Sequence, residues 1–303
     1  MRRALIVLVL LAALAGGAFW ALTAPRPLEA AVLPAEAGDP TRGEALFWAG
    51  GCAGCHAAPG AEGDAKRLLA GGVAIRTEFG TFHAPNISPD PEHGIGKWST
   101  LDFVNAMKKG LAPDGSHLYP AFPYTSYQRM TVSDLVDLDA FLKTLPADAT
   151  PSRPHDLAFP YSFRRGLGLW KLLYLDGETF TPDPAKSDAV NRGAYLVEGP
   201  GHCGECHTPR TVLGGLDRAH AFAGAPNPDG PGTIPNITSG KGGIADWTAE
   251  DIAAALETGF TPDFDSLGGS MAEVQRNMAH LTPDDRLAIG LYLKQLPPQD
   301  TAP

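Results

Sequence analysis

Basic side chains are scarce in this sequence. Its 303 residues include 24 lysines and arginines against 34 aspartates and glutamates, which gives a formal net charge of −10 at pH 7. A nucleic-acid-binding protein needs a basic face toward the phosphates, so this charge argues against that class of function. A basic or polar protein partner suits an acidic chain better.

Recognisable catalytic groupings are missing as well. We find no Ser/His/Asp arrangement, no phosphate-binding loop and no separate metal cluster in the sequence. Cysteine is rare, with four in the chain, whereas 35 glycines and 28 prolines favour many turns and irregular connections. The hydrophobic fraction of 44% is enough for packed cores, and the length suits about two domains.

All four cysteines fall in two C-x-x-C-H motifs. These are Cys52, Cys55 and His56 in "GGCAGCH", and Cys203, Cys206 and His207 in "GHCGECH". In this motif the two thiols form thioethers with the haem vinyl groups, and the histidine supplies the proximal nitrogen to the iron. We therefore predict two covalently bound haem c groups, with His56 and His207 as iron ligands.

Three other uses of paired cysteines fit less well. Paired zinc knuckles place their C-x-x-C units about 15–20 residues apart, whereas these units are separated by 203 − 52 = 151 residues. Two disulfides would suit an exported chain but would not explain a histidine after each second cysteine. A thioredoxin-like redox pair would need a surrounding βαβ pattern, which the sequence lacks.

The spacing of 151 residues extends beyond the two motifs. The same shift aligns "TVSDLVDLDAFLKTLP" from Thr131 with "TPDDRLAIGLYLKQLP" from Thr282. A shift of 150 aligns "PNIS" at 85–88 with "PNIT" at 235–238. We predict two copies of one domain, at residues 38–148 and 186–299, joined by a linker at 149–185.

Each copy has the pattern of a small helical domain. An amphipathic segment precedes each haem motif, and the aligned segments above predict a last helix that stops before a proline. Ser99 and Thr248, each with an aspartate three residues on, predict a middle helix that ends near Gly110 or Gly259. The linker is rich in proline, and we expect it to be extended apart from a short helix within "FRRGLGLWKLLYL".

The N-terminal segment, residues 1–25, has the layout of a signal-anchor. Arg2 and Arg3 precede an uncharged run at 4–24, which has 24 − 4 + 1 = 21 residues. As a helix this run would reach about 30 Å, enough to cross a bilayer, and Trp20 would lie near its outer end. Pro25 follows the nearest candidate cleavage site. We predict an uncleaved helix that holds the chain on the inner membrane, facing the bacterial periplasm; a cleaved signal is the alternative.

A family resemblance rests on these motifs together. The haem motifs, "PNISPDPEHGIGKWS" from Pro85, "HLYPAFPYTSY" from His117 and the segment from Met271 to Pro297 resemble membrane-associated cytochrome c subunits of periplasmic alcohol and gluconate dehydrogenases. The resemblance implies an all-α fold of two tandem class I cytochrome c domains behind an N-terminal hydrophobic helix. It also implies histidine and methionine ligation, and electron transfer. Such subunits often carry three haems, whereas this chain has cysteines for two.

The resemblance implies a methionine before the last helix as the sixth iron ligand. Met271 fits in the second copy, 271 − 247 = 24 residues after Trp247. Its alternative role is core packing, and Met278 is a weaker rival as ligand. In the first copy the same spacing from Trp98 leads to Phe122, which has no lone pair to donate.

The distal ligand of the first iron is therefore less well defined. We predict Met130, although it aligns with Leu281 and could instead be a hydrophobic staple that packs on Leu135. An open or weakly bound iron is one alternative. Ligation by His117 or His83 is another.

Two functions follow from these sites. The first is a pure electron carrier, which takes electrons from a dehydrogenase and passes them to an oxidase or a soluble cytochrome. The second is a haem enzyme whose open or labile first haem acts on thiosulfate, sulfite or peroxide. The far side of the first haem separates the two. We favour the carrier because both recognisable sites are haem sites.

Overall fold

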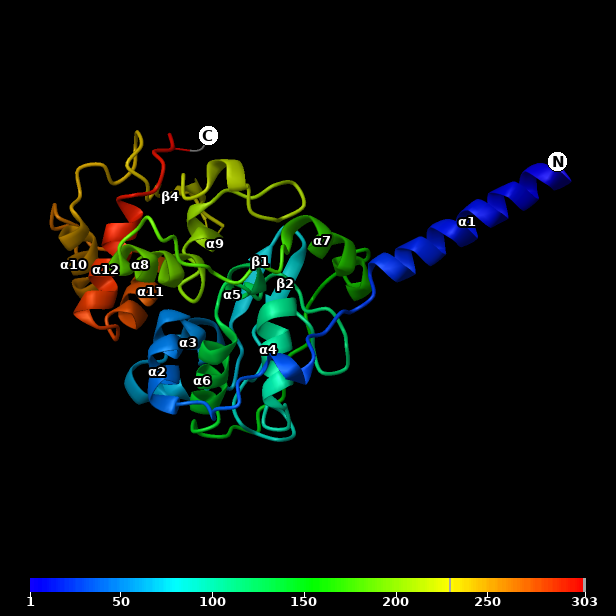
Figure 1. Ribbon diagram of the computed structural model, residues 1–303, viewed down its shortest axis with the longest axis horizontal. Helices are drawn as coiled ribbons and strands as arrows, with labels where there is room; N and C mark the ends of the chain where they lie inside the picture. Colours follow the sequence, from blue (N-terminus) through cyan, green and yellow to red (C-terminus); the bar gives the residue numbers. More distant parts are fainter. Residues whose placement is uncertain (229, 302–303) are drawn as a thin grey trace.

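The computed structural model describes residues 1–228 and 230–301. Two sets of helices lie side by side, and α1 (Arg2–Leu22) projects from one end of the body (Figure 1). By length and composition α1 is able to cross a membrane. A connecting segment with the short helix α7 (Leu167–Tyr174) joins the two sets and lies at the end of the body nearest α1.

The two sets of helices repeat the same order along the chain. The first comprises α2 (Pro40–Ala49), α3 (Cys52–His56), α4 (Thr100–Lys109), α5 (Tyr124–Tyr127) and α6 (Val132–Leu142). The second comprises α8 (Asp188–Glu198), α9 (Gly204–His207), α10 (Ala249–Thr258), α11 (Ser270–Met278) and α12 (Pro283–Leu293). Short 3-10 turns lie at η1 (Ala30–Val32), η2 (Gly63–Arg67), η3 (Arg164–Gly166) and η4 (Arg218–His220).

Two small hairpins make the all-α expectation incomplete. Strand β1 (Ala74–Thr77) pairs antiparallel with β2 (Gly80–His83), with Ile75 opposite Phe82. Strand β3 (Ala225–Pro226) pairs in the same way with β4 (Thr233–Ile234). Strands of two to four residues are too short for an alternating pattern to be recognised in sequence.

The predicted helix boundaries are confirmed where capping residues set them. Ser99 forms a capping box with Asp102 at the start of α4, and Thr248 forms one with Asp251 at the start of α10. Both helices end at a glycine in the left-handed region, Gly110 with φ 58° and Gly259 with φ 82°. Glycine adopts this conformation at little cost because it has no Cβ.

The first and last helices of each set cross at a glycine. A Cβ on Gly43 of α2 would lie 2.0 Å from the carbonyl oxygen of Asp137 on α6. A Cβ on Gly193 of α8 would lie 1.9 Å from the carbonyl oxygen of Ala288 on α12. Any larger residue would push these helices apart, so the repeat preserves the close crossing in both sets.

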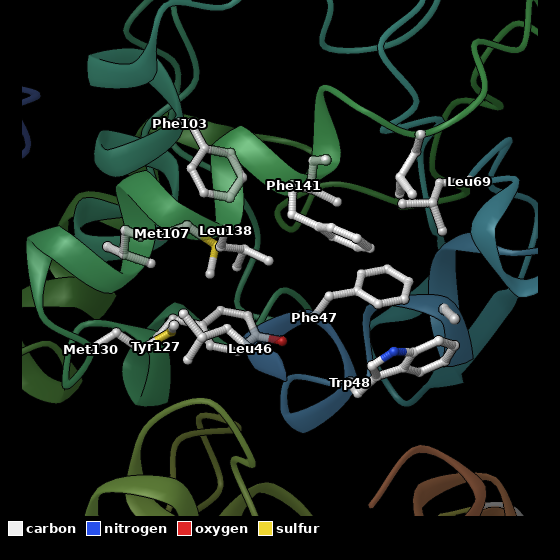
Figure 2. Close-up of a cluster of buried hydrophobic side chains, with 14 of the residues drawn as sticks. Leu46, Phe47, Trp48, Leu69, Phe103, Met107, Tyr127, Met130, Leu138 and Phe141 are labelled. Atoms are coloured by element: carbon white, nitrogen blue, oxygen red, sulfur yellow. The ribbon is translucent and has the colours of Figure 1, made fainter. Parts of the chain in front are cut away.

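The core of the first set lies around this crossing (Figure 2). Phe47 of α2 packs on Phe141 of α6, with ring centroids 5.2 Å apart. The apolar face predicted for the last helix is buried here through Leu135, Leu138, Leu142 and Leu145. This packing holds α2 firmly in place, and α2 leads directly into the first haem motif.

Candidate functional site

Each C-x-x-C-H motif forms a single helical turn. Cys52 and Cys55 lie on α3, while Cys203 caps α9 and Cys206 lies within it. Their spacing of three residues places the two sulfurs of a pair on one side of the turn. None of the four forms a disulfide. Burial raises the pKa of Cys52 and of Cys203 to about 12.

The two motif histidines are held in one tautomer. Nδ1 of His56 lies 2.8 Å from the carbonyl oxygen of Pro85, and Nδ1 of His207 lies 2.7 Å from that of Pro235. A carbonyl only accepts, so Nδ1 must carry the proton and donate it. Burial lowers the pKa of both histidines, which keeps them neutral. Each therefore presents an unprotonated Nε2, the atom that binds iron.

The proline carbonyls are fixed by the asparagine that follows each of them. Asn86 donates to the carbonyl oxygen of Asp148 at 2.8 Å and accepts from the Ser88 amide at 2.9 Å. Asn236 donates to the carbonyl oxygen of Gln299 at 2.7 Å and accepts from the Thr238 amide in the same way. These contacts tie each loop to the chain beyond the last helix of its set. They explain why "PNIS" and "PNIT" recur.

The donor set in each half fits haem c. Two cysteines on one helical turn match the thioether positions, and a neutral histidine with an unprotonated Nε2 matches the proximal iron ligand. Cys52, Cys55 and His56 would hold one group, and Cys203, Cys206 and His207 would hold another. Haem c supplies one-electron redox chemistry when it is bound.

The distal side differs between the two halves. Met271 lies in the first turn of α11, partly buried, and packs on a core that includes Cys203, Ile237 and Ile244 at its edge. In the first half, Cys52, Ile87, Ile95 and Phe122 are likewise partly buried and pack on the edge of the core. Phe122 is therefore the counterpart of Met271 both in its spacing of 24 residues from the tryptophan and in its burial.

The structure buries Met130 in the core of the first half. Its side chain is 1% exposed and belongs to the same cluster as Leu46, Tyr127 and Leu135 (Figure 2). This burial agrees with the packing role expected of a hydrophobic staple. The ligand role of Met130 stays a prediction. Met278, the weaker rival of Met271, is likewise buried in the core of the second half.

The two histidines considered as distal ligands have other partners. His117 uses both ring nitrogens, Nε2 toward the carbonyl oxygen of Thr23 at 2.9 Å and Nδ1 toward Lys171 Nζ at 3.0 Å. Nε2 of His83 lies 2.9 Å from a carboxylate oxygen of Asp156. These contacts favour structural roles for both residues.

Comparison with known proteins agrees with this chemistry. Residues 40–146 match the cytochrome c family. A "Diheme cytochrome c-type" protein of Cereibacter sphaeroides is 51% identical over 98% of this chain and 99% of its own length. The chain belongs to the cytochrome c family. Covalently bound haem c is the cofactor of this family, and the chain is thus a c-type cytochrome of mostly helical fold.

Longer relatives are subunits of dehydrogenases. The "Fructose dehydrogenase cytochrome subunit" of Gluconobacter japonicus is 38% identical over 87% of this cytochrome and 54% of its own length. The "Gluconate 2-dehydrogenase cytochrome c subunit" of Pantoea cypripedii is 35% identical over 86% of this cytochrome and 60% of its own length. The chain thus spans little more than half the length of these subunits.

The two haem motifs of this cytochrome meet where its halves touch. The carbonyl oxygen of Gly50, just before the first motif, accepts from the Tyr127 hydroxyl at 3.2 Å and lies 3.3 Å from His202 Nε2, just before the second. Burial raises the pKa of the Cys55 thiol, and the nearby Cys206 thiol raises it further. The contact between Gly50 and His202 therefore holds the two motifs next to each other.

Polar contacts on both sides hold the motifs together. Lys66 Nζ lies 2.6 Å from a Glu273 oxygen and 3.1 Å from Oδ1 of Asn277, which joins the first half to α11. Glu205, inside the second motif, accepts from the hydroxyls of Thr125 and Ser126 on α5. Sequence reasoning missed these residues because no local pattern marks a contact between segments that lie 79–211 residues apart.

Proposed function

We propose that this cytochrome is a periplasmic, dihaem electron carrier organised as two cytochrome c domains, 38–148 and 186–299. It accepts electrons from a dehydrogenase and passes them to an oxidase or a soluble cytochrome. The dehydrogenase donor is supported by the printed names of the longer relatives. Two haems per chain are supported by the two complete donor sets and by the dihaem relative.

The proximity of the two motifs carries this proposal. A thioether joins haem to protein at the haem edge. Gly50 and His202 lie just before the two motifs and contact each other, so the haem edges attached there would lie near each other. The protein itself contributes rigidity. Lys66, His202 and Glu205 fix one half against the other, and the bonded histidines keep their tautomer throughout. A carrier gains from such a fixed arrangement, since no group has to move between turnovers.

The proposal also includes where the protein lies in the cell and what kind of partner it meets. We propose that α1 remains attached and anchors the body to the inner membrane on its periplasmic side. The charge of −10 favours steering toward a basic partner, through a small interface that releases after each turnover. Raising the ionic strength should therefore slow the reaction with such a partner.

Pulse radiolysis of the full-length protein tests the carrier function. A pyridine haemochrome assay should first give two haems per chain. After a pulse that delivers less than one electron per chain, one spectral phase should follow whose rate does not depend on protein concentration, because the electron redistributes within the molecule. A redistribution rate proportional to protein concentration would count against internal transfer.

Phe122 supports a second candidate function. A phenylalanine at the distal position leaves no donor there, so the first haem would be open or labile and able to act on thiosulfate, sulfite or peroxide. The unmutated ferric protein would then contain a high-spin component that shifts on adding cyanide or sulfide. A fully low-spin spectrum that neither anion changes would remove this candidate.

A further inference from the structure

The base of α1 is clamped onto the connecting segment. Thr23, at the end of α1, is 1% exposed. Arg165 Nε donates to its hydroxyl at 2.8 Å, and Arg165 Nη2 donates to the carbonyl oxygen of Trp20 at 2.7 Å. A Cβ on Gly168 would lie 2.6 Å from Thr23, so α7 passes directly against the chain here. The direction in which α1 leaves the body is therefore fixed.

Exposed apolar side chains gather around this base. Beyond residue 22, the described part of the chain has twelve large apolar residues that are strongly exposed, and eight of them lie in the segments 159–173 and 212–213. The eight are Phe159, Tyr161, Phe163, Leu169, Leu172, Leu173, Val212 and Leu213. We call these two segments the foot surface. Leu173 is 67% exposed and Val212 is 92% exposed, values that suit an apolar surrounding better than water.

The two segments of the foot surface are joined to each other, and one of them contacts the end of α1. Phe163 stacks on Phe19 of α1, with ring centroids 6.0 Å apart. Trp170 Nε1 donates to the carbonyl oxygen of Leu213 at 2.9 Å, which joins α7 to the loop at 212–213. Figure 1 shows α7 at the end of the body from which α1 projects.

The charge of the foot surface contrasts with the rest of the chain. Acidic residues outnumber basic ones by 34 to 24 overall, yet residues 159–175 contain no aspartate or glutamate. Arg164 and Arg165 lie among the exposed aromatic residues of this segment, and the Arg165 guanidinium lies 4.4 Å from the ring centroid of Trp20. Aromatic rings and arginines are the side chains that occupy the headgroup level of a bilayer.

We propose that the foot surface rests in the headgroup region of the same bilayer that α1 crosses. This inference rests on the membrane anchoring proposed above. A lipid occupant is favoured over a protein partner because α1 leaves from within the surface. A bilayer around α1 therefore meets Phe163, Leu172 and Leu173 without any further contact being needed. The clamp and the foot surface would together hold the haem body in one orientation above the membrane.

Spin labels on the full-length chain test whether the foot surface contacts the headgroup region. Leu173→Cys and Phe264→Cys each place a nitroxide at an exposed apolar site, the second on the loop before α11 at the opposite end of the body. The native cysteines do not compete for label once they carry haem. In nanodiscs of neutral and anionic phospholipid, the label at 173 should collide several-fold less with a water-soluble nickel chelate, and more with oxygen, than the label at 264.

The intact mass of the same sample shows whether α1 is still attached. It therefore distinguishes failure of the foot-surface inference from failure of the proposed anchor. An intact chain whose labels at 173 and 264 are equally accessible to the chelate would overturn this inference and leave the anchor standing. Protection at 173 that develops only after a protein partner is added would also overturn the lipid assignment. A mature membrane-isolated chain that begins beyond Ala24 would overturn the anchor and this inference together.

Discussion

The second half of the molecule has Met271 where the first half has Phe122. Everything else about attachment is shared: two thiols on a helical turn, a histidine bonded to a proline carbonyl, and an asparagine that pins the loop. If Met271 is the distal ligand, the attachment scaffold and the distal ligand vary independently. A first haem that lacks a thioether ligand would then have a lower potential than the second, since a thioether raises it.

The contacts between the halves differ in a similar way. On one side a buried ammonium, Lys66, joins Glu273 and Asn277; on the other, the hydroxyls of Thr125 and Ser126 reach Glu205. The repeat thus supplies matching surfaces, but the side chains that join them are specific to each side. Such specificity favours a single relative placement of the two haem motifs.

Replacing Met271 should change the spectrum and the potential of the second haem more than any other substitution proposed below. Met271→Leu should abolish one methionine-to-iron charge-transfer signal and lower the potential of the second haem, because no other thioether lies at the distal position. Near-infrared magnetic circular dichroism and a redox titration measure both. Met278→Leu, a buried control, should keep the signal; loss of the signal in Met278→Leu alone would reverse the assignment.

Introducing a methionine at position 122 should give both haems the same kind of distal ligand. The double variant Phe122→Met/Met130→Leu should show two methionine-to-iron signals, because a thioether then stands at the distal position of both halves. The same dichroism spectrum counts the signals. A single remaining signal would mean that Phe122 does not face the first iron.

Breaking the charged contact between the halves should have an intermediate effect. Lys66→Ala should lower the free energy of unfolding of the holoprotein by about 1–3 kcal/mol, because it leaves the partly buried oxygens of Glu273 and Asn277 without their donor. Lys97→Ala is the matched control, since its pair with Glu92 is exposed on both sides. It should cost less than about 1 kcal/mol. Equal costs in denaturant titrations would refute a special role for Lys66.

Met130→Leu should have the smallest effect on stability. The volumes are similar and Leu281 fills the aligned position in the second half, so the change in unfolding free energy should stay below about 1.5 kcal/mol. The ligand role proposed for Met130 predicts loss of one methionine-to-iron signal on top of this small change. An unaltered spectrum would assign Met130 to packing alone.

The sequence by itself determined the parts of this protein that depend on local chemistry. The C-x-x-C-H motifs, the capping residues Ser99 and Thr248, and the glycines that end α4 and α10 act within a few residues of their position. The internal repeat then carried each assignment from one half to the other. For this reason the helix order and the family's cofactor were predictable, while the residues that anchor the cofactor stay a prediction.

Only the tertiary structure decided which distant residues meet. It placed His117 between Thr23 and Lys171, brought His202 to Gly50, and joined Lys66 to Glu273. It also showed that the end of α1 is part of the folded body. These contacts join segments far apart in the chain, and they depend on packing summed over whole helices rather than on any pattern of neighbouring residues.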